Sequence, residues 1–127
     1  MEVWTMMNDE TKEVVGQKIL VANSFFRRLK GLMFQKSLGE YDGLLLTKTK
    51  QIHMFWMRFS IDVVYLRRVG KKENGLLFRV VDLYEEMKPW TIGKWVLQAT
   101  DVLEVKAGWI REQKISKGDL FLAKKLF

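Results

Sequence analysis

The chain has 127 residues, of which 48% are hydrophobic and 13% aromatic, and it carries a net charge of +7. This length predicts a single domain over residues 1–127, with a core large enough to fold without disulfides. The sequence has no cysteine and one histidine, which excludes disulfides, thiolate zinc sites, cysteine nucleophiles and histidine-rich metal sites. We therefore expect no metal and no cofactor. No signal peptide and no run long enough to span a membrane is present, so we expect a cytoplasmic protein without a membrane partner.

The positive charge is unevenly distributed along the chain. It is concentrated in residues 27–50 and in a later group made of Arg67, Arg68, Lys71 and Lys72. A basic surface of this kind makes nucleic acid a partner to consider, through non-specific contacts to phosphates. Because no nucleic-acid-binding motif is present, we do not expect nucleic acid as a partner and interpret the charge as a solubility property.

The first elements in chain order are a hairpin and a short strand. Val3–Met7 and Glu13–Val15 flank residues 8–11, whose Asn-Asp-Glu-Thr sequence predicts the hairpin turn. Lys18–Ala22 then predicts a separate short strand.

A short helix is predicted next. Asn23 or Ser24 can cap its first turn, and Gly31 stands where a left-handed terminating residue is needed. A helix of about two turns is not stable alone, so we expect it to dock through Phe25 and Leu29.

The segment Gln51–Tyr65 holds the single histidine among large apolar side chains. Its β-branched and aromatic content predicts two short strands joined by a bend at Arg58–Ser60. His53–Met57 is apolar on both faces, which is typical of a central strand covered on both sides.

Turn signals divide the remaining chain into further short elements. Asn74-Gly75 predicts one turn, a loop surrounds Pro89 over Glu85–Gly93, and Trp109–Ile115 predicts a helical turn. The predicted strands are Gly43–Thr47, Ile61–Arg68, Leu76–Leu83, Trp95–Ala99, Val102–Lys106 and Leu120–Ala123. The fold class is therefore mainly β (α+β), with about seven short strands that form a small barrel or a sandwich and one short N-terminal helix.

Several short motifs occur in a fixed order along the chain: Gly31-Leu32-Met33, Gly43-Leu44-Leu45, His53-Met54-Phe55-Trp56-Met57-Arg58, Ile61-Asp62-Val63-Val64-Tyr65-Leu66, Val102 to Gly108, and Gly118-Asp119. In this order they resemble the domain of unknown function 192 family, over about residues 18–123. The resemblance implies a mostly β, barrel-like fold with a short helix near its start, and it implies no mechanism. The chain departs from the family at Phe59, where an amide side chain is usual.

Three polar residues near these motifs are candidates for a site. Asp62 interrupts an apolar strand, so it either holds the backbone, by bracing the bend at Arg58–Ser60 or pairing with Arg28, or serves as a carboxylate in a pocket. Arg28 is either solvated or part of a buried ion pair or anion contact. His53 is either a hydrogen-bonded core residue or an acid–base group. Glu104 alternates with Leu103 and Val105, so we expect it to point away from their face and to be exposed.

Two functional hypotheses follow. The first is a binding module for an unidentified small molecule, whose ligand-binding residues are Arg28, Met33, Trp56, Met57 and Asp62, with Trp90 as a further wall. The alternative is a small hydrolase or isomerase with Asp62 as base and Arg28 or His53 as its electrostatic partner.

Overall fold

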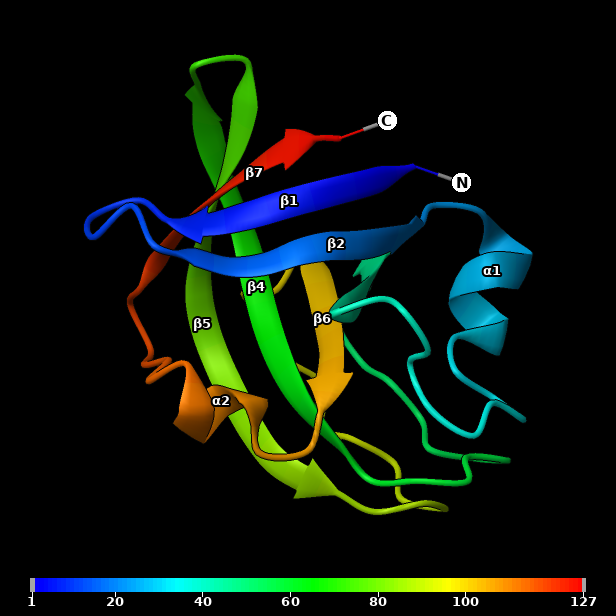
Figure 1. Cartoon of the computed structure of the whole chain (residues 1–127). Coiled ribbons are helices and arrows are strands. Elements are labelled where there is room, and N and C mark those ends of the chain that lie inside the picture. The colour runs from blue at the N-terminus through cyan, green and yellow to red at the C-terminus, as the bar shows by residue number, and fades with distance from the viewer. Residues whose placement is uncertain (1, 127) are drawn as a thin grey trace.

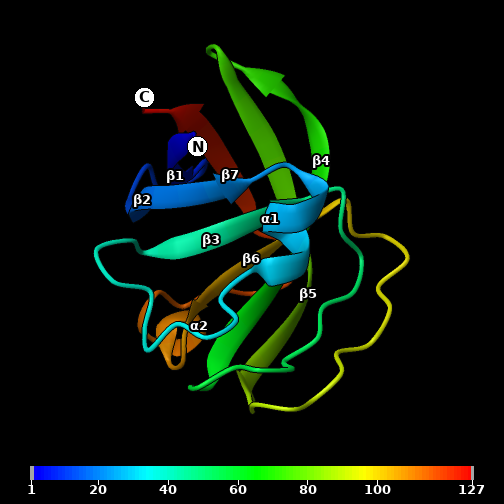
Figure 2. The same cartoon turned by 90° about the vertical axis from the view of Figure 1, so that its right-hand side faces the viewer.

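The computed structural model describes residues 2–126, and for Phe25 and Phe26 it describes the backbone alone. The strands in this range close a barrel in the order β1-β2-β3-β6-β4-β5-β7, with β7 paired back to β1 (Figures 1 and 2). The strands are β1 (Val3–Asn8), β2 (Val14–Ala22), β3 (Gly43–Thr47), β4 (Ile61–Lys72), β5 (Gly75–Met87), β6 (Asp101–Lys106) and β7 (Leu120–Lys125), and the helices are α1 (Phe25–Lys30) and α2 (Trp109–Glu112). The prediction of a mainly β barrel of about seven strands with a short helix near its start is confirmed.

The position of α1 follows from the pairing of β2 with β3. These two strands run parallel, whereas the other neighbouring strands of the barrel are antiparallel. Parallel neighbours cannot be joined by a tight turn, so residues 23–42 cross over the outside of the barrel and carry α1 with them. In Figure 2, α1 lies in front of β3 and β6.

The ends of α1 agree with the sequence, but its docking contact differs. The Ser24 hydroxyl accepts a hydrogen bond from the Arg27 amide, and Gly31 ends the helix with φ 48°. The expectation that Leu29 docks is wrong, because this side chain is 53% exposed and Leu32, two residues beyond the helix end, is buried instead. The side chain of Phe25 lies outside the described residues.

The barrel has two hydrophobic cores, one on each side of its wall. The interior core contains Ile19, Leu45, Phe78, Leu103 and Phe121, among others. A second core lies on the outer face of β3, β6 and the first half of β4, where Leu44, Val63 and Val102 are covered by Leu32, Met54 and Val96. We call the covering layer the cap and define it as residues 25–39, 48–60 and 88–100.

The prediction of strands within residues 51–60 and Trp95–Ala99 is wrong. Both segments are loops of the cap that run side by side, with an isolated bridge between His53 and Ile92. The Met54 amide donates to the Thr91 carbonyl at 2.7 Å, and the Gly93 amide donates to the Ile52 carbonyl at 2.9 Å. The strands covered on both faces are therefore β3, β6 and the start of β4.

Three boundaries also differ from the prediction. β2 is one continuous strand where two were expected, and β5 continues to Met87, inside the expected loop. The β4–β5 turn is centred on Glu73 and Asn74, both at positive φ, and Gly75 already belongs to β5.

Candidate functional site

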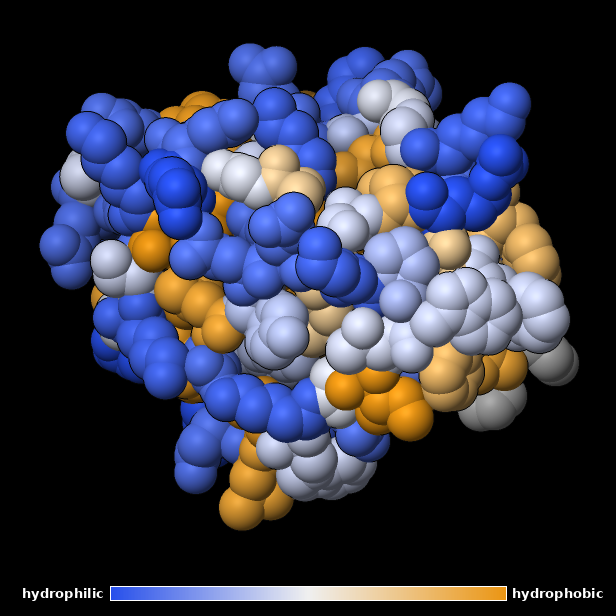
Figure 3. Space-filling model, turned by 90° about the horizontal axis from the view of Figure 1, so that it is seen from below, coloured by the Kyte–Doolittle hydropathy of each residue, from blue (hydrophilic) through white to orange (hydrophobic). Residues whose placement is uncertain are grey.

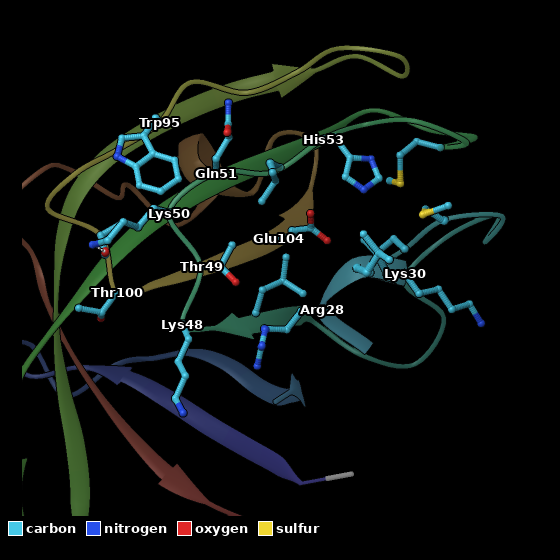
Figure 4. Close-up of a pocket in the computed structure, with 18 residues that line it drawn as sticks. Arg28, Lys30, Lys48, Thr49, Lys50, Gln51, His53, Trp95, Thr100 and Glu104 are labelled. Carbon is cyan, nitrogen blue, oxygen red and sulfur yellow. Dashed lines mark hydrogen bonds between the residues drawn. The ribbon is translucent and has the colours of Figure 1, made fainter. Parts of the chain in front are cut away.

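A pocket of about 690 Å³ lies between the cap and the outer face of the barrel wall (Figure 4). The crossover that carries α1, the loop that follows β3, the loop that precedes β6, and β6 itself all contribute to its lining. The apolar part of the wall is formed by Leu32, Met33, Leu46, Ile52, Met57 and Ala99. Its volume falls within the range that accommodates small organic ligands.

Glu104 of β6 is the polar group buried deepest in this pocket. Its carboxyl is 4% exposed and, among the described residues, Oε1 has no hydrogen-bond partner. Figure 4 shows the carboxyl pointing into the space between the α1 segment and His53. Burial raises the pKa of the Glu104 carboxyl to about 8, so at neutral pH this group is mostly protonated and can donate as well as accept a hydrogen bond.

The position of Glu104 follows from strand alternation. Glu104 pairs with Leu44 of β3 and with Val63 of β4, and these partners belong to the second core. Alternation therefore turns Glu104 to the outer face of the wall, away from Leu103 and Val105. The expectation that Glu104 is exposed is wrong because the cap covers this face. The sequence signal for a buried Glu104 was a charged residue inside the run Val102–Val105. The sequence did not show that the cap covers this face, so it could not show that Glu104 is buried.

His53 lies at the edge of the pocket and presents a hydrogen-bond donor. Its Nδ1 accepts a hydrogen bond from the Phe55 amide at 3.2 Å. A ring nitrogen that accepts carries no proton, so in the neutral ring the proton is on Nε2. His53 and Glu104 face each other in Figure 4.

Cationic side chains stand around the mouth of the pocket. Arg28 lines it, but its guanidinium points away from Glu104 and donates to the Asn23 carbonyl at 3.1 Å. Lys30 and Lys48 are exposed and extend outward. The site thus combines an apolar interior, one buried carboxyl and a positive rim.

The structure places Asp62 away from this pocket. Asp62 is fully buried and its two oxygens accept three backbone hydrogen bonds, from Glu86 at 2.8 Å, Ile110 at 3.0 Å and Gly108 at 3.1 Å. It pairs with Val105 on the interior face of the wall, so it joins the end of β5 to the β6–α2 turn. Its hydrogen-bond partners are therefore these backbone amides, not Arg28 or the bend at Arg58–Ser60, and Asp62 does not line the pocket that Arg28 and His53 line.

The other predicted residues divide into two groups. Arg28, Met33, His53 and Met57 all line the pocket. Trp56 does not line it: this ring is 52% exposed and packs edge-on against Trp90, with 4.9 Å between the ring centroids. Within residues 2–126, no group of three His, Asp or Glu side chains is arranged to hold a metal ion.

With this geometry in place, known proteins can be compared with the chain. The model of the domain of unknown function 192 family, described as "Uncharacterized ACR", matches residues 6–122. The chain belongs to this family. The match begins within β1, before the start near Lys18 that the motifs predict, and ends within β7, so it includes β2 to β6 in full.

Two archaeal relatives carry the same kind of name as this family. The protein is 33% identical over 118 residues to UPF0127 protein PH1112 of Pyrococcus horikoshii, covering 90% of this chain and 95% of the relative. It is 30% identical over 120 residues to UPF0127 protein TK1120 of Thermococcus kodakarensis, covering 91% of this chain and 71% of the relative. Neither name states an activity.

Two solved structures share the fold of this family member. A Sinorhizobium meliloti protein, described as a candidate transcription regulator, superposes with a TM-score of 0.74 at 17% identity, over 98% of this chain and 92% of that one. A Novosphingobium aromaticivorans protein of unknown function superposes with a TM-score of 0.69 at 18% identity, over 94% and 82% of the two chains. At these identities the likeness shows the fold alone. In residues 2–126, no helix is long and apolar enough to cross a membrane.

Proposed function

We propose that this protein binds a small, largely apolar molecule carrying a hydrogen-bonding group, in the pocket beneath the cap. The observation that carries the proposal is the buried carboxyl of Glu104, which faces the pocket with Oε1 unpaired. A ligand amide, amine or carbonyl placed there would satisfy an atom that the described chain leaves without a partner.

The energetic cost of Glu104 supports a ligand over a purely structural role. A buried polar atom without a partner costs about 1–3 kcal/mol, and an apolar residue of similar size would remove this cost. Groups with strongly shifted pKa values inside clefts are concentrated at functional sites, where residues needed for function often lower the stability of the fold. The Nε2 proton of His53 supplies a second polar contact at the edge of the same pocket.

The test uses N-phenyl-1-naphthylamine, an uncharged apolar probe with one N–H group whose fluorescence rises in apolar surroundings. We expect saturable binding that Met33→Trp weakens at least about tenfold, because the larger ring fills the pocket. Leu38→Trp is the matched control: it also lies in the crossover and is half-buried, but it lines a different hollow. Equal binding by both variants, or no saturable binding by the native chain, would contradict the proposal.

One observation favours a second candidate function, a hydrolase or isomerase. The carboxyl of Glu104, with its pKa raised to about 8, faces His53 across the pocket, and the two could exchange protons with a substrate between them. In this version Glu104 replaces Asp62 as the acid–base group. Screening ester and ketone substrates with the native chain, Glu104→Gln and His53→Gln tests it: turnover that both variants abolish supports the enzyme, and turnover unchanged in either variant rejects it.

A further inference from the structure

The cap differs from the rest of the chain in its charge. Its three segments contain nine of the 22 lysines and arginines and none of the 15 aspartates and glutamates. The remaining residues hold the other 13 cations against all 15 acids, so the whole positive excess of the protein belongs to the cap. A segment group with nine cations and no acid differs from an average solvated surface, where positive and negative side chains are normally interspersed.

The cap also exposes large apolar side chains. Seven of them, exposed by between 52% and 69%, are Leu29, Trp56, Trp90, Phe34, Ile92, Trp95 and Leu97. Figure 3, which views the molecule from below, shows pale and orange side chains gathered on the right, with hydrophilic ones prevailing on the left. Contiguous exposed apolar surface marks interaction sites in folded proteins.

Four aromatic rings of the cap, those of Phe34, Phe55, Trp56 and Trp90, form a connected cluster on hydrogen-bonded loops. Trp56 packs against Trp90 and also stacks on Phe34 at 5.9 Å, while Phe55 lies 6.0 Å from Trp90. The Phe34 amide donates to the Trp56 carbonyl at 2.9 Å, and the Trp90 amide donates to the Met54 carbonyl at 2.7 Å. Phe34, Trp56 and Trp90 all have left-handed backbones, at φ 68°, 63° and 67°. Such a backbone is unfavourable for an aromatic residue, so these rings are held outward at a cost in stability.

We infer that the cap docks onto the surface of an anionic lipid membrane, with its aromatic and aliphatic side chains in the headgroup region and its cations on lipid phosphates. Tryptophan is favoured at the membrane interface, and each lysine or arginine near an anionic leaflet adds about 1 kcal/mol. The charge of the cap is complementary to such a surface. The inference concerns the outside of the cap and stands independently of a ligand in the pocket.

Nucleic acid is the competing anionic partner, and two features disfavour it. The aliphatic side chains of Ile92 and Leu97 are among the most exposed, and aliphatic groups offer no stacking face to a base. The rings of the cluster pack on one another at 29° to 63°, which occupies faces that successive bases would need.

The expectation of no membrane partner rested on the absence of a long apolar run, and a surface assembled from three separate segments leaves no such run.

The test is co-sedimentation with vesicles of phosphatidylglycerol and phosphatidylcholine in equal parts, compared with pure phosphatidylcholine. We expect binding to the anionic vesicles that weakens with salt, and at least about tenfold weaker binding to the neutral ones. Trp56→Asn with Trp90→Asn should reduce binding at least about tenfold, and asparagine suits this design because it tolerates left-handed backbone. The matched control is Val69→Asn with Tyr84→Asn, which removes exposed apolar side chains of β4 and β5 and should leave binding unchanged.

Two double variants that each remove two cations distinguish the contribution of the cap from that of net charge. Lys36→Gln with Arg58→Gln should weaken binding about fivefold for each cation removed, whereas Lys71→Gln with Lys114→Gln, outside the cap, should have little effect. Equal losses in both pairs, equal binding to both kinds of vesicle, or no binding would overturn the inference. A single-stranded oligonucleotide that binds through the same tryptophans and is not displaced by vesicles would also overturn it, in favour of nucleic acid.

Discussion

Asp62 and Glu104 are buried acids on neighbouring strands of one wall, and the two faces of that wall treat them differently. On the interior face, the oxygens of Asp62 accept three backbone hydrogen bonds that join β5 to the β6–α2 turn. On the outer face, Glu104 faces a pocket, and its Oε1 has no hydrogen-bond partner among the described residues. The interior of the barrel uses its acid to hold the fold, whereas the layer beneath the cap leaves its acid available. Burial alone therefore does not distinguish a structural acid from a functional one; the hydrogen-bond partners do.

Removing the interior acid gives the largest expected effect. Asp62→Ala leaves the backbone amides of Glu86, Gly108 and Ile110 without their acceptor in a buried place. We expect the free energy of unfolding to fall by roughly 3–5 kcal/mol. Urea denaturation measures it, and a loss below about 1 kcal/mol would show that the interior acid is as dispensable as an exposed one.

Replacing the outer acid, Glu104, should raise the free energy of unfolding. The pKa of Glu104 rises from 4.5 to about 8 on folding, so the native chain keeps its full stability below pH 4.5 and loses stability as the pH rises toward 8. Glu104→Gln removes this loss and should be more stable than the native chain by about 3 kcal/mol at pH 7, with little difference at pH 4. Urea denaturation at both pH values measures the difference. If the free energy of unfolding changed with pH in the same way for both proteins, the raised pKa of Glu104 would be contradicted.

Removing one ion pair between the cap and the barrel should change the stability less than either of these substitutions. Lys94 of the cap forms an ion pair with Asp82 of β5. Burial raises the pKa of Asp82, but hydrogen bonds from Lys94, the Leu83 amide and Lys117 outweigh it, so the pKa lies below its usual value.

Lys94→Met should lower the free energy of unfolding by at most about 1 kcal/mol, because Lys94 is largely exposed. This contribution should be present above pH 3.8 and should disappear as the pH falls through the lowered pKa of Asp82. Chemical denaturation against pH tests it, with Lys88→Met as the control on the same loop.

The smallest effect is expected at the surface of the cap. Trp56→Asn should change the free energy of unfolding by less than about 0.5 kcal/mol, because the ring is half exposed and asparagine adopts the left-handed backbone more easily. Trp109, 3% exposed in the interior core, provides the contrast: Trp109→Ala should cost roughly 3–5 kcal/mol. Thermal denaturation of both variants makes the comparison, and similar losses would mean that the exposed rings support the fold.

Local patterns were sufficient to predict a mainly β fold of about seven short strands, and the family resemblance indicated that these strands form a barrel. The strands Gly43–Thr47 and Val102–Lys106 were found from their apolar runs. The start of α1 was predicted at Asn23 or Ser24, of which Ser24 caps the helix, and its end was predicted at Gly31. The cap was misjudged because its buried residues, such as Met54 and Met57, are as apolar as those of a strand. Composition cannot show that they cover a wall already built by other residues.

The pocket could be predicted only in part for the same reason. Arg28, Met33, His53 and Met57 were identified because they stand in recognisable motifs. Glu104 was missed, since its burial depends on residues 48–60 and 88–100 folding over β6. The partners of Asp62 come from β5, from the turn before α2 and from α2 itself, and no spacing along the sequence indicates these contacts.

The pairing of β1 with β7 has a consequence for the order in which the protein folds during its synthesis. Trp4 pairs with Lys125, so β1 emerges from the ribosome long before the strand that closes the barrel beside it. Until β7 is made, β1 and β5 each present an unpaired edge, and such edges are prone to pair with other chains. The slow, concentration-sensitive stage of folding should therefore be the arrival of β7, which makes shortening or mutating Leu120–Lys125 a more direct route to aggregation than any change in the cap.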